Sequence, residues 1–330
     1  MKSVKKCFEQ EVATTVESIR RVRGEGDLCF ALLTDSLLYD TGVDTRENIR
    51  AVDDAVGFDF IAHLGNFISG VNPEKISRRL FREELEAYRN CTAGGKLLVG
   101  QGDQDGYRDE NFAGQMVWSI VRDDMWHEDT AFLDSYENLH REGDAPYYFI
   151  DFPEKKVRIV VLCSYQHEFD GEHLLFEKRT TYGLKQVAWM QDKALDLDEG
   201  WQVLFLSHAL PKSRFETGKD PFIYKGFSTE KVLSIVQKAA RERKITVIGF
   251  LGGRYGYDAE IKVAEIPHIA IGKQFPQGCP TPSVEGAVTP ETRELGTVYQ
   301  DLWDACVLRP EERKLYLFRF GAGEDRVIEY

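Results

Sequence analysis

The chain has 330 residues, of which 42% are hydrophobic and 29% charged, the composition of a globular protein with a large core. Its formal net charge of −13 argues against nucleic acid or an anionic membrane as the main partner. No apolar run reaches the roughly 18–20 residues that cross a bilayer, the N-terminus lacks the apolar core of a signal peptide, and the six cysteines form no CxxC pair. We therefore expect a cytoplasmic protein with no nucleic-acid or membrane partner.

The first part of the chain alternates short apolar runs with amphipathic segments. Residues 1–27 are charged and have a helical pattern. The strands predicted next are Asp27–Asp35, Phe58–Gly65 and Lys96–Asp103, and the helices predicted between them are Thr45–Ala55 and Pro73–Asn90. This βαβαβ order is typical of a parallel sheet covered by helices.

The rest of the chain continues the alternation after a polar and aromatic stretch, residues 123–145, which predicts an insertion over the sheet edge. The elements predicted beyond it are paired strands Tyr147–Phe152 and Lys156–Ser164, helix Leu184–Leu195, strand Trp201–His208, helix Thr229–Arg243, strand Ile245–Gly253 and two strands after Gly296. We see no repeat, low-complexity tract or linker, so residues 1–330 are predicted to form a single domain.

Five predicted strands stop at a cluster of polar or glycine residues. Each cluster alone is typical of a turn, but five in succession favour one shared site. In an open α/β sheet, ligands bind beyond the carboxyl ends of the strands, and glycine lets the backbone approach a ligand closely. The clusters are Thr34–Leu37, Gly65–Asn66, Gly102–Asp105, Ser207–His208 and Gly252–Gly256.

The order and spacing of these clusters resemble the motifs D-x-H, G-D, G-N-H-D, a lone H and G-H-x-H of the calcineurin-like metallophosphoesterases. The stretches LSHALP, from Leu206, and RFGAGEDR, Arg319–Arg326, are also similar to bacterial members of that family. The resemblance runs from about Asp27 to the C-terminus. It implies an α/β fold, a four-layer αββα sandwich of two mixed sheets flanked by helices. It also implies two transition metals that activate a hydroxide for attack on phosphorus.

Several positions depart from those motifs. The residues that match are Asp35 for the first aspartate, Asp105 for the last carboxylate and His208 for the lone histidine. The replacements are Leu37 for a histidine ligand, Asn66 for the bridging aspartate, Asp103 for the asparagine, Gln104 for the histidine that assists the leaving group, and Arg254 and Gly256 for the last two histidines. Because metal affinity depends on the type and number of ligands, we expect no cofactor beyond a single weakly bound divalent metal. Its ligands would be Asp103 and His208, helped by Asn66.

Arg254 could supply the charge that the missing metals would have carried. If Asp35 and Asp103 lie close together without a metal, a guanidinium could neutralise both through bidentate hydrogen bonds. The alternative is that Arg254 points into solvent and the two acids are hydrated separately. A small anionic ligand or a phosphate-containing substrate would be the partner of such a site. Its predicted binding residues are Asn66, Gln104, Arg254 and Tyr255.

The remaining candidates have ordinary structural explanations. We expect His63 to be a satisfied core histidine, and His167 and His173 to lie in a solvated loop. His268 lies near a late strand end and could approach the crevice. Four residues could line the pocket or could equally serve packing: Tyr107, Arg108, Tyr255 and Tyr257.

Two classes of function fit these residues. The favoured one is a metallophosphoesterase-like scaffold, inactive or non-standard as a phosphoesterase, that binds an anionic ligand. The alternative is an active hydrolase that uses a reduced metal site or carboxylate acid/base chemistry, since paired carboxylates with separated pKa values can do such work. Its catalytic residues would be Asp35, Asp103, Asp105 and His208. A third interpretation, that ligand residues have been replaced in an otherwise active enzyme, also stays open.

Overall fold

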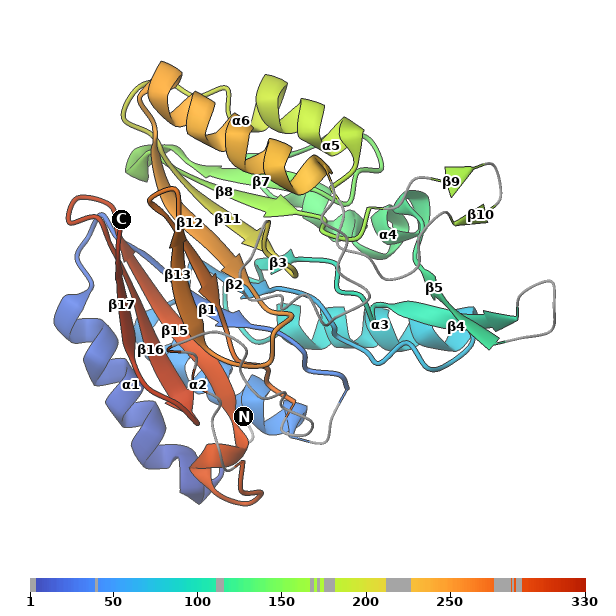
Figure 1. Ribbon diagram of the computed structural model, residues 1–330. Helices are drawn as coiled ribbons and strands as arrows, with labels where there is room; N and C mark the ends of the chain where they lie inside the picture. Colours follow the sequence, from blue (N-terminus) through green and yellow to red (C-terminus); the bar gives the residue numbers. More distant parts are fainter. Residues whose placement is uncertain are drawn as a thin grey trace.

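The computed structural model describes residues 4–38, 41–110, 116–166, 169–170, 173–174, 182–211, 227–275, 286, 288 and 293–330. Two β-sheets form its centre, and helices lie on both outer sides (Figure 1). Among the helices in these ranges, none is long and apolar enough to cross a membrane.

The first sheet joins the two ends of the chain. Its six strands lie in the order β17-β16-β15-β1-β2-β3. β1, β2 and β3 are parallel, as the βαβαβ pattern predicts, whereas β1 pairs antiparallel with β15 near the C-terminus. The strand bounds are β1 Leu28–Leu33, β2 Phe60–His63, β3 Leu97–Val99, β15 Leu302–Arg309, β16 Lys314–Gly321 and β17 Arg326–Glu329.

The second sheet is built from the middle of the chain. Its seven strands lie in the order β13-β14-β12-β11-β8-β7-β6, with a parallel centre of β8, β11, β12 and β14. The strand bounds are β6 Leu139–Arg141, β7 Tyr148–Phe152, β8 Val157–Leu162, β11 Gln202–Ser207, β12 Thr246–Gly252, β13 Ala259–Val263 and β14 Ile266–Ala270. Two short hairpins lie apart from both sheets, β4 Gly106–Glu110 with β5 Met116–Ile120, and β9 Phe169–Asp170 with β10 His173–Leu174.

The side chains of β1 show how the layers stack. Successive residues of a strand point to opposite faces. Leu28, Phe30 and Leu32 pack into the core between the two sheets. Cys29, Ala31 and Leu33 pack into the core beneath the helices. Both faces are therefore buried, which explains why the strand reads as a continuous apolar run.

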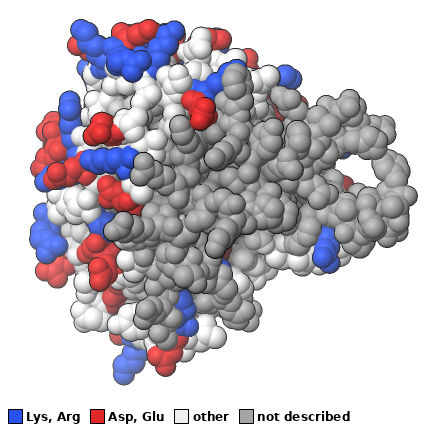
Figure 2. All heavy atoms as spheres, in the orientation of Figure 1, with Lys and Arg blue, Asp and Glu red and all other residues white. Residues whose placement is uncertain are grey.

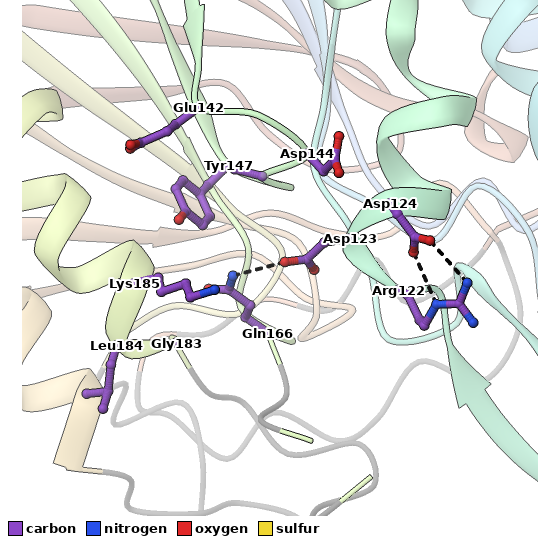
Figure 3. Close-up of a pocket in the computed structure, with 11 residues that line it drawn as sticks. Arg122, Asp123, Asp124, Glu142, Asp144, Tyr147, Gln166, Gly183, Leu184 and Lys185 are labelled. Carbon is purple, nitrogen blue, oxygen red and sulfur yellow. Dashed lines mark hydrogen bonds and ion pairs between the residues drawn. The ribbon is translucent and has the colours of Figure 1, made fainter. Parts of the chain in front are cut away.

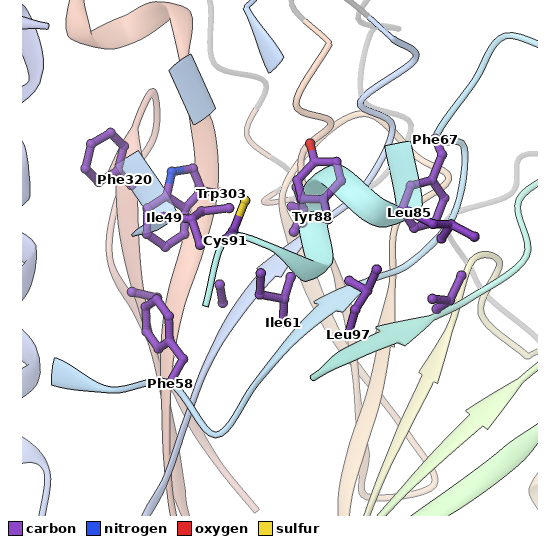
Figure 4. Close-up of a cluster of buried hydrophobic side chains, with 14 of the residues drawn as sticks. Ile49, Phe58, Ile61, Phe67, Leu85, Tyr88, Cys91, Leu97, Trp303 and Phe320 are labelled. Atoms are coloured by element: carbon purple, nitrogen blue, oxygen red, sulfur yellow. The ribbon is translucent and has the colours of Figure 1, made fainter. Parts of the chain in front are cut away.

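Helices cover the outer face of each sheet. Those on the first sheet are α1 Glu9–Val22, α2 Gly42–Val56 and α3 Glu74–Arg89, whose apolar side chains meet the sheet in one core. Figure 4 shows part of this core, including Ile49 of α2 and Leu85 and Tyr88 of α3. Those on the second sheet are α5 Leu184–Trp189, which continues as a π-helical segment, and α6 Phe227–Arg243. The predicted four-layer αββα sandwich of two mixed sheets is confirmed.

The stretch predicted as an insertion contains α4 Asp123–Asp129 and the edge strand β6. β6 pairs with β7, so this stretch extends the second sheet.

Acidic and basic side chains are interspersed over the described part of the face in Figure 2. The negative net charge is thus not the property of one patch on that part of the surface.

Candidate functional site

The polar residues that follow the sheet strands meet in one hydrogen-bonded cluster. Its members are Asp35 after β1, Asn66 after β2, Asp103 and Asp105 after β3, and His208 after β11. The backbone N–H groups of Gly253 and Arg254 donate to the carbonyl oxygen of His208, at 2.9 and 3.0 Å, which joins the end of β12 to the cluster. All five strand-end clusters of the sequence therefore converge.

Asn66 lies at the centre of the cluster and is 2% exposed. Its Nδ2 is 2.8 Å from Asp35 Oδ1, 3.0 Å from Asp103 Oδ1 and 3.1 Å from His208 Nε2. Its Oδ1 accepts a hydrogen bond of 2.8 Å from the backbone N–H of Gln104. Exchanging the amide oxygen and nitrogen would set a carbonyl against two carboxylates, so the network fixes the orientation of the amide.

The hydrogen bonds of His208 define its protonation. Nδ1 lies 2.9 Å from the carbonyl oxygen of Leu64, which can only accept, so Nδ1 carries a hydrogen. The two hydrogens of Asn66 Nδ2 are taken by the two carboxylates. Nε2 is satisfied if it also carries a proton and donates to Asp103 Oδ1, 3.4 Å away. The cationic imidazolium thus leaves every group in the cluster with a partner.

The pKa shifts agree with this assignment. Burial acts to lower the pKa of His208, but the hydrogen bond to Asp103 and the negative charges of the three aspartates raise it above its ordinary value. Burial acts to raise the pKa of Asp103, but the hydrogen bond and charge of His208, with Arg254 and Asn66, hold it well below its usual range. Burial raises the pKa of Asp35, although the charge of His208 and the hydrogen bonds from Asn66 and from the hydroxyl of Thr34 act to lower it. Asp103 and His208 are therefore the ion pair of the site.

Asp105 is held entirely by the backbone. Its carboxylate accepts N–H bonds from Asn66 at 2.7 Å, Phe67 at 2.6 Å, Gly102 at 2.9 Å and Ile68 at 3.3 Å. Burial raises the pKa of Asp105 to about 6, and these N–H groups oppose that rise. Asp105 thereby ties the chain after β3 to the chain after β2.

Arg254 acts on the cluster from outside it. Among the described residues, no ion pair joins Arg254 to Asp35 or Asp103, so the predicted direct pairing is not present. Its guanidinium carbon lies 5.8 Å from the ring centroid of Tyr165. Its charge still helps to lower the pKa of Asp103. The role of the missing metal charge falls instead to His208 and the amide of Asn66.

The backbone at the site is strained. Asp35, Leu37 and Asn66 have φ angles of 55°, 50° and 59°, in the left-handed region. Aspartate and asparagine tolerate this region, whereas leucine enters it at a penalty of about 1–2 kcal/mol. The conformation is held by hydrogen bonds from Asp35 N–H to Gly65 O and from Leu37 N–H to Asn66 O, at 3.0 and 3.1 Å. Such strain is characteristic of functional sites.

His63 and Ser36 form a contact that resembles a catalytic dyad but cannot act as one. The backbone N–H of Gly65 donates to His63 Nδ1, so the hydrogen of the neutral ring is on Nε2, which lies 3.0 Å from Ser36 Oγ. The histidine therefore donates to the serine and cannot take its proton. Burial and the charge of His208 lower the pKa of His63 well below its ordinary value. His63 is the satisfied core histidine that the sequence predicts.

The other sequence candidates lie mainly in packing positions. Tyr255 and Tyr257 are in the core between the second sheet and its helices, and Tyr107 is in the core beneath α1 to α3. The hydroxyl of Tyr255 accepts a hydrogen bond of 2.9 Å from the backbone N–H of Leu210. His268 is fully buried in β14. His167 lies outside the described residues, and His173 belongs to β10.

Sequence reasoning missed Tyr165 and assigned no role to Thr34, although Thr34 belongs to the first strand-end cluster. The hydroxyl of Thr34 donates to Asp35 Oδ2 at 2.9 Å, and the ring of Tyr165 lies 5.8 Å from the ring of His208. Tyr165 follows β8 within three residues. The other clusters were predicted because they follow the ends of strands. The same reasoning, applied to β8, would have predicted Tyr165.

The residues do not fit a two-metal centre. Among the parts of the chain that the structure describes, no group of three or more His, Cys, Asp or Glu residues is arranged to hold a metal ion. The Nδ2 atom of Asn66 turns hydrogens toward the carboxylates at the position where the resemblance expects a bridging carboxylate. A cation there would face two N–H hydrogens in place of oxygen lone pairs.

A separate cavity of about 870 Å³ lies beside α4 and α5 (Figure 3). Its lining includes Asp123, Glu142 and Asp144 together with Tyr147 and Lys185. None of the strand-end cluster is among its lining residues. It is therefore not the candidate site.

Comparison with known proteins gives structural neighbours only. No protein-family model and no curated protein matches the sequence. Among solved structures, the chain is similar to GAP50, the anchor in the inner membrane complex of Plasmodium, with 12% identity, 88% of this chain and 83% of that chain covered, and a TM-score of 0.44. It is similar to a conserved uncharacterized protein of Streptococcus pneumoniae TIGR4, described as a predicted phosphoesterase, with 9% identity, coverage of 92% and 98%, and a TM-score of 0.31. It is also similar to phosphopantetheinyl hydrolase (PptH) of Mycobacterium tuberculosis, with 12% identity, coverage of 76% and 91%, and a TM-score of 0.38. The likeness of this chain to each of the three concerns the fold alone.

Proposed function

We propose that this chain is a metallophosphoesterase-like protein that does not carry out two-metal hydrolysis and that acts by binding an anionic ligand. The observation that carries the proposal is the position of the Asn66 amide, whose two hydrogens are donated to Asp35 and Asp103. Protein groups thus occupy the oxygen atoms that a metal would need.

The surrounding residues support the same conclusion. His208 is engaged with Leu64 and Asp103, so a metal would have to displace a proton from its Nε2. Gln104 cannot protonate a leaving group near neutral pH. Each of these two features hinders a different part of metal-assisted hydrolysis.

An anionic ligand is favoured by a cation of the site. Arg254 is partly exposed, and its guanidinium keeps its charge at every physiological pH. The charge of His208 is neutralised by Asp103, so the proposal depends on Arg254. A phosphate group is the proposed ligand chemistry, because a guanidinium recognises phosphate oxygens through paired hydrogen bonds.

The test combines metal analysis, an activity screen and binding of inorganic phosphate. We expect well under one equivalent of manganese, iron or zinc in the purified protein, and no manganese-stimulated hydrolysis of phosphomonoesters or diesters. Phosphate should raise the Tm of the natural chain and of the control Arg141→Gln, but not that of Arg254→Gln. Arg141 is a suitable control because it contacts Thr130 and Asp134, away from the cluster.

The alternative function predicts a different set of results. Stoichiometric metal, with metal-stimulated turnover that Asp103→Ala or His208→Ala abolishes, would show that a reduced metal site suffices for hydrolysis. Equal phosphate stabilisation of the natural chain and Arg254→Gln would remove Arg254 from the ligand site.

A further inference from the structure

The aromatic ring of Tyr165 lies beside both cationic side chains of the candidate site. Its centroid is 5.8 Å from the ring centroid of His208 and 5.8 Å from the guanidinium carbon of Arg254. Tyr165 is 1% exposed, so water has little access to its side chain. An aromatic face attracts a cation within about 6 Å of its centroid, and the attraction is stronger where water is excluded. The ring therefore favours positive charge at this side of the site.

The two residues before Tyr165 fix the place of its ring. The thiol of Cys163 donates to Gln101 Oε1 at 3.1 Å, in the segment that leads into the third strand-end cluster. The hydroxyl of Ser164 accepts a hydrogen bond of 3.0 Å from the backbone N–H of Ala209, which directly follows the fourth cluster. Cys163 and Ser164 are fully buried. The chain that carries the ring is thus anchored without the help of Arg254.

The side chain of Arg254 needs such an anchor in order to bind a ligand well. Its backbone N–H is bonded to the carbonyl oxygen of His208 at 3.0 Å, but the guanidinium stands at the end of a long, partly exposed side chain. An arginine loses much rotamer freedom when its head group is immobilised by a ligand. A ring that already holds the guanidinium reduces this loss, because the binding group is preorganised.

We propose that Tyr165 is a positioning residue whose aromatic face holds the guanidinium of Arg254 where it receives the anionic ligand. This role of Arg254 rests on the proposed function, but the contact between the two side chains is testable without a ligand. The contact depends on the ring and not on the hydroxyl, so phenylalanine should replace Tyr165 and leucine should not.

A double-mutant cycle in phosphate-free buffer tests the contact itself. Its four chains are the natural chain, Tyr165→Leu, Arg254→Gln and the double variant. The fall in Tm caused by Tyr165→Leu should be about 1 °C smaller in the Arg254→Gln background, where the contact is already absent. The same cycle with Tyr165→Phe should be additive. Additive changes with Tyr165→Leu would overturn the proposal.

Titration with inorganic phosphate tests the consequence for binding. The Kd should be unchanged in Tyr165→Phe and raised about threefold to tenfold in Tyr165→Leu. The control is Tyr147→Leu, which also removes a buried tyrosine ring, one that contacts the ring of Trp189 at 4.7 Å and lines the separate cavity. It should lower the Tm and keep the Kd of the natural chain.

Two further results of this titration have distinct meanings. Equal weakening in Tyr165→Phe and Tyr165→Leu would overturn the positioning role of the ring. A natural chain that does not bind phosphate would overturn the proposed function, whereas the double-mutant cycle decides in either case whether Tyr165 holds Arg254.

The Nε–Hε signal of Arg254 in an NMR spectrum of the natural chain gives a measurement that does not depend on a Tyr165 variant that folds. Its absence from the spectrum of Arg254→Gln identifies it. The ring current of Tyr165 should move this Hε resonance upfield of the ordinary arginine position. A resonance at the ordinary position would show that the ring does not hold the guanidinium and would overturn the proposal.

Discussion

Asn66 resembles an aspartate in shape, but it presents two hydrogens where the resemblance expects lone pairs. Two like charges about 4 Å apart repel by about 4 kcal/mol at an effective dielectric near 20. The amide, placed between Asp35 and Asp103, moderates this repulsion by donating to both carboxylates. His208 completes the neutralisation as a cation. A single residue therefore converts the centre of the cluster from a set of acceptors into a closed network.

Asn66→Asp tests this role. It removes two donors and adds a fourth carboxylate to the cluster, so in EDTA the free energy of unfolding should fall by about 3–5 kcal/mol. Added Mn²⁺ should recover part of this loss, because the bridging ligand has been restored. Asn66→Ala, which removes the donors without adding charge, should be destabilised but insensitive to Mn²⁺. Urea unfolding with and without metal measures both effects; an Asn66→Asp variant as stable as the natural chain in EDTA would contradict the account.

His268 makes stability depend on pH. Burial lowers the pKa of His268 to about 4, from an ordinary value of 6.5, while its Nδ1 stays bonded to Ile266 O. The folded protein thus binds fewer protons than the unfolded chain between these two values, so stability is complete above pH 6.5 and is lost as the pH falls toward 4. The linked change is about 3 kcal/mol.

The measurement is the free energy of unfolding of the natural chain and of His268→Leu from pH 7 to pH 4. The variant should lose stability less steeply with acidification, because His268 no longer contributes. His63, whose pKa is also lowered, is present in both proteins and cancels in the comparison. Parallel pH profiles would rule out the contribution of His268.

At the scale of elements, two arginines join the sheets. Arg319 of β16 bonds Asp304 of β15 through Nε at 2.9 Å, and Asp258 through Nη1 and Nη2 at 2.8 and 2.9 Å. Asp258 lies between β12 and β13 of the second sheet, and Arg326 donates to the carbonyl of Ala270 at the end of β14. The stretch Arg319–Arg326, noted in the sequence for its similarity to family members, therefore supplies both arginines of a buried network that spans the sandwich.

Removing Arg319 should be strongly destabilising. Arg319→Met leaves Asp258 and Asp304 buried without their main cation, and we expect a loss of about 3–5 kcal/mol in the free energy of unfolding. Arg309→Met is the matched control, because the Arg309–Asp27 pair is more exposed and should contribute less than about 1 kcal/mol. Equal losses in the two variants would show that the network does not join the sheets energetically.

The sequence predicts these elements unevenly, and the reasons are physical. Strands buried on both faces, such as β1, β8 and β11, read as apolar runs and were located within a few residues. β13 carries the period-two alternation of a half-buried strand and could have been predicted, whereas β17 was missed because it is a short edge strand. The sequence predicts which residues belong to the site, because they follow the ends of strands. It does not predict which of them form hydrogen bonds with one another. Residue type alone could not show that His208, and not Arg254, would contact Asp103.

At the scale of the whole molecule, three features connect the two halves. β15 lies beside β1, so the C-terminal strands complete the sheet that the N-terminal strands begin (Figure 1). The core between the sheets takes side chains from both of them. The Arg319 network crosses the same boundary. Each sheet, with the helices that cover it, therefore depends on the other sheet for buried surface. We predict that the chain unfolds as one cooperative unit.

Tryptophans on opposite sides of the sandwich can report on this. Trp303 lies in the core beneath α1 to α3, and Trp189 lies in the core beneath α6. In one variant Trp303 is kept and the other four tryptophans are replaced by phenylalanine; in the second, Trp189 is kept. Within each variant, the fluorescence midpoint in urea should coincide with the midpoint from far-UV circular dichroism. If either fluorescence midpoint departs from its circular dichroism midpoint by about 1 M or more, one side of the sandwich unfolds before the other. The Arg319 network would then be a local feature of the first sheet and its edge, since a network that couples the sheets cannot survive the loss of one of them.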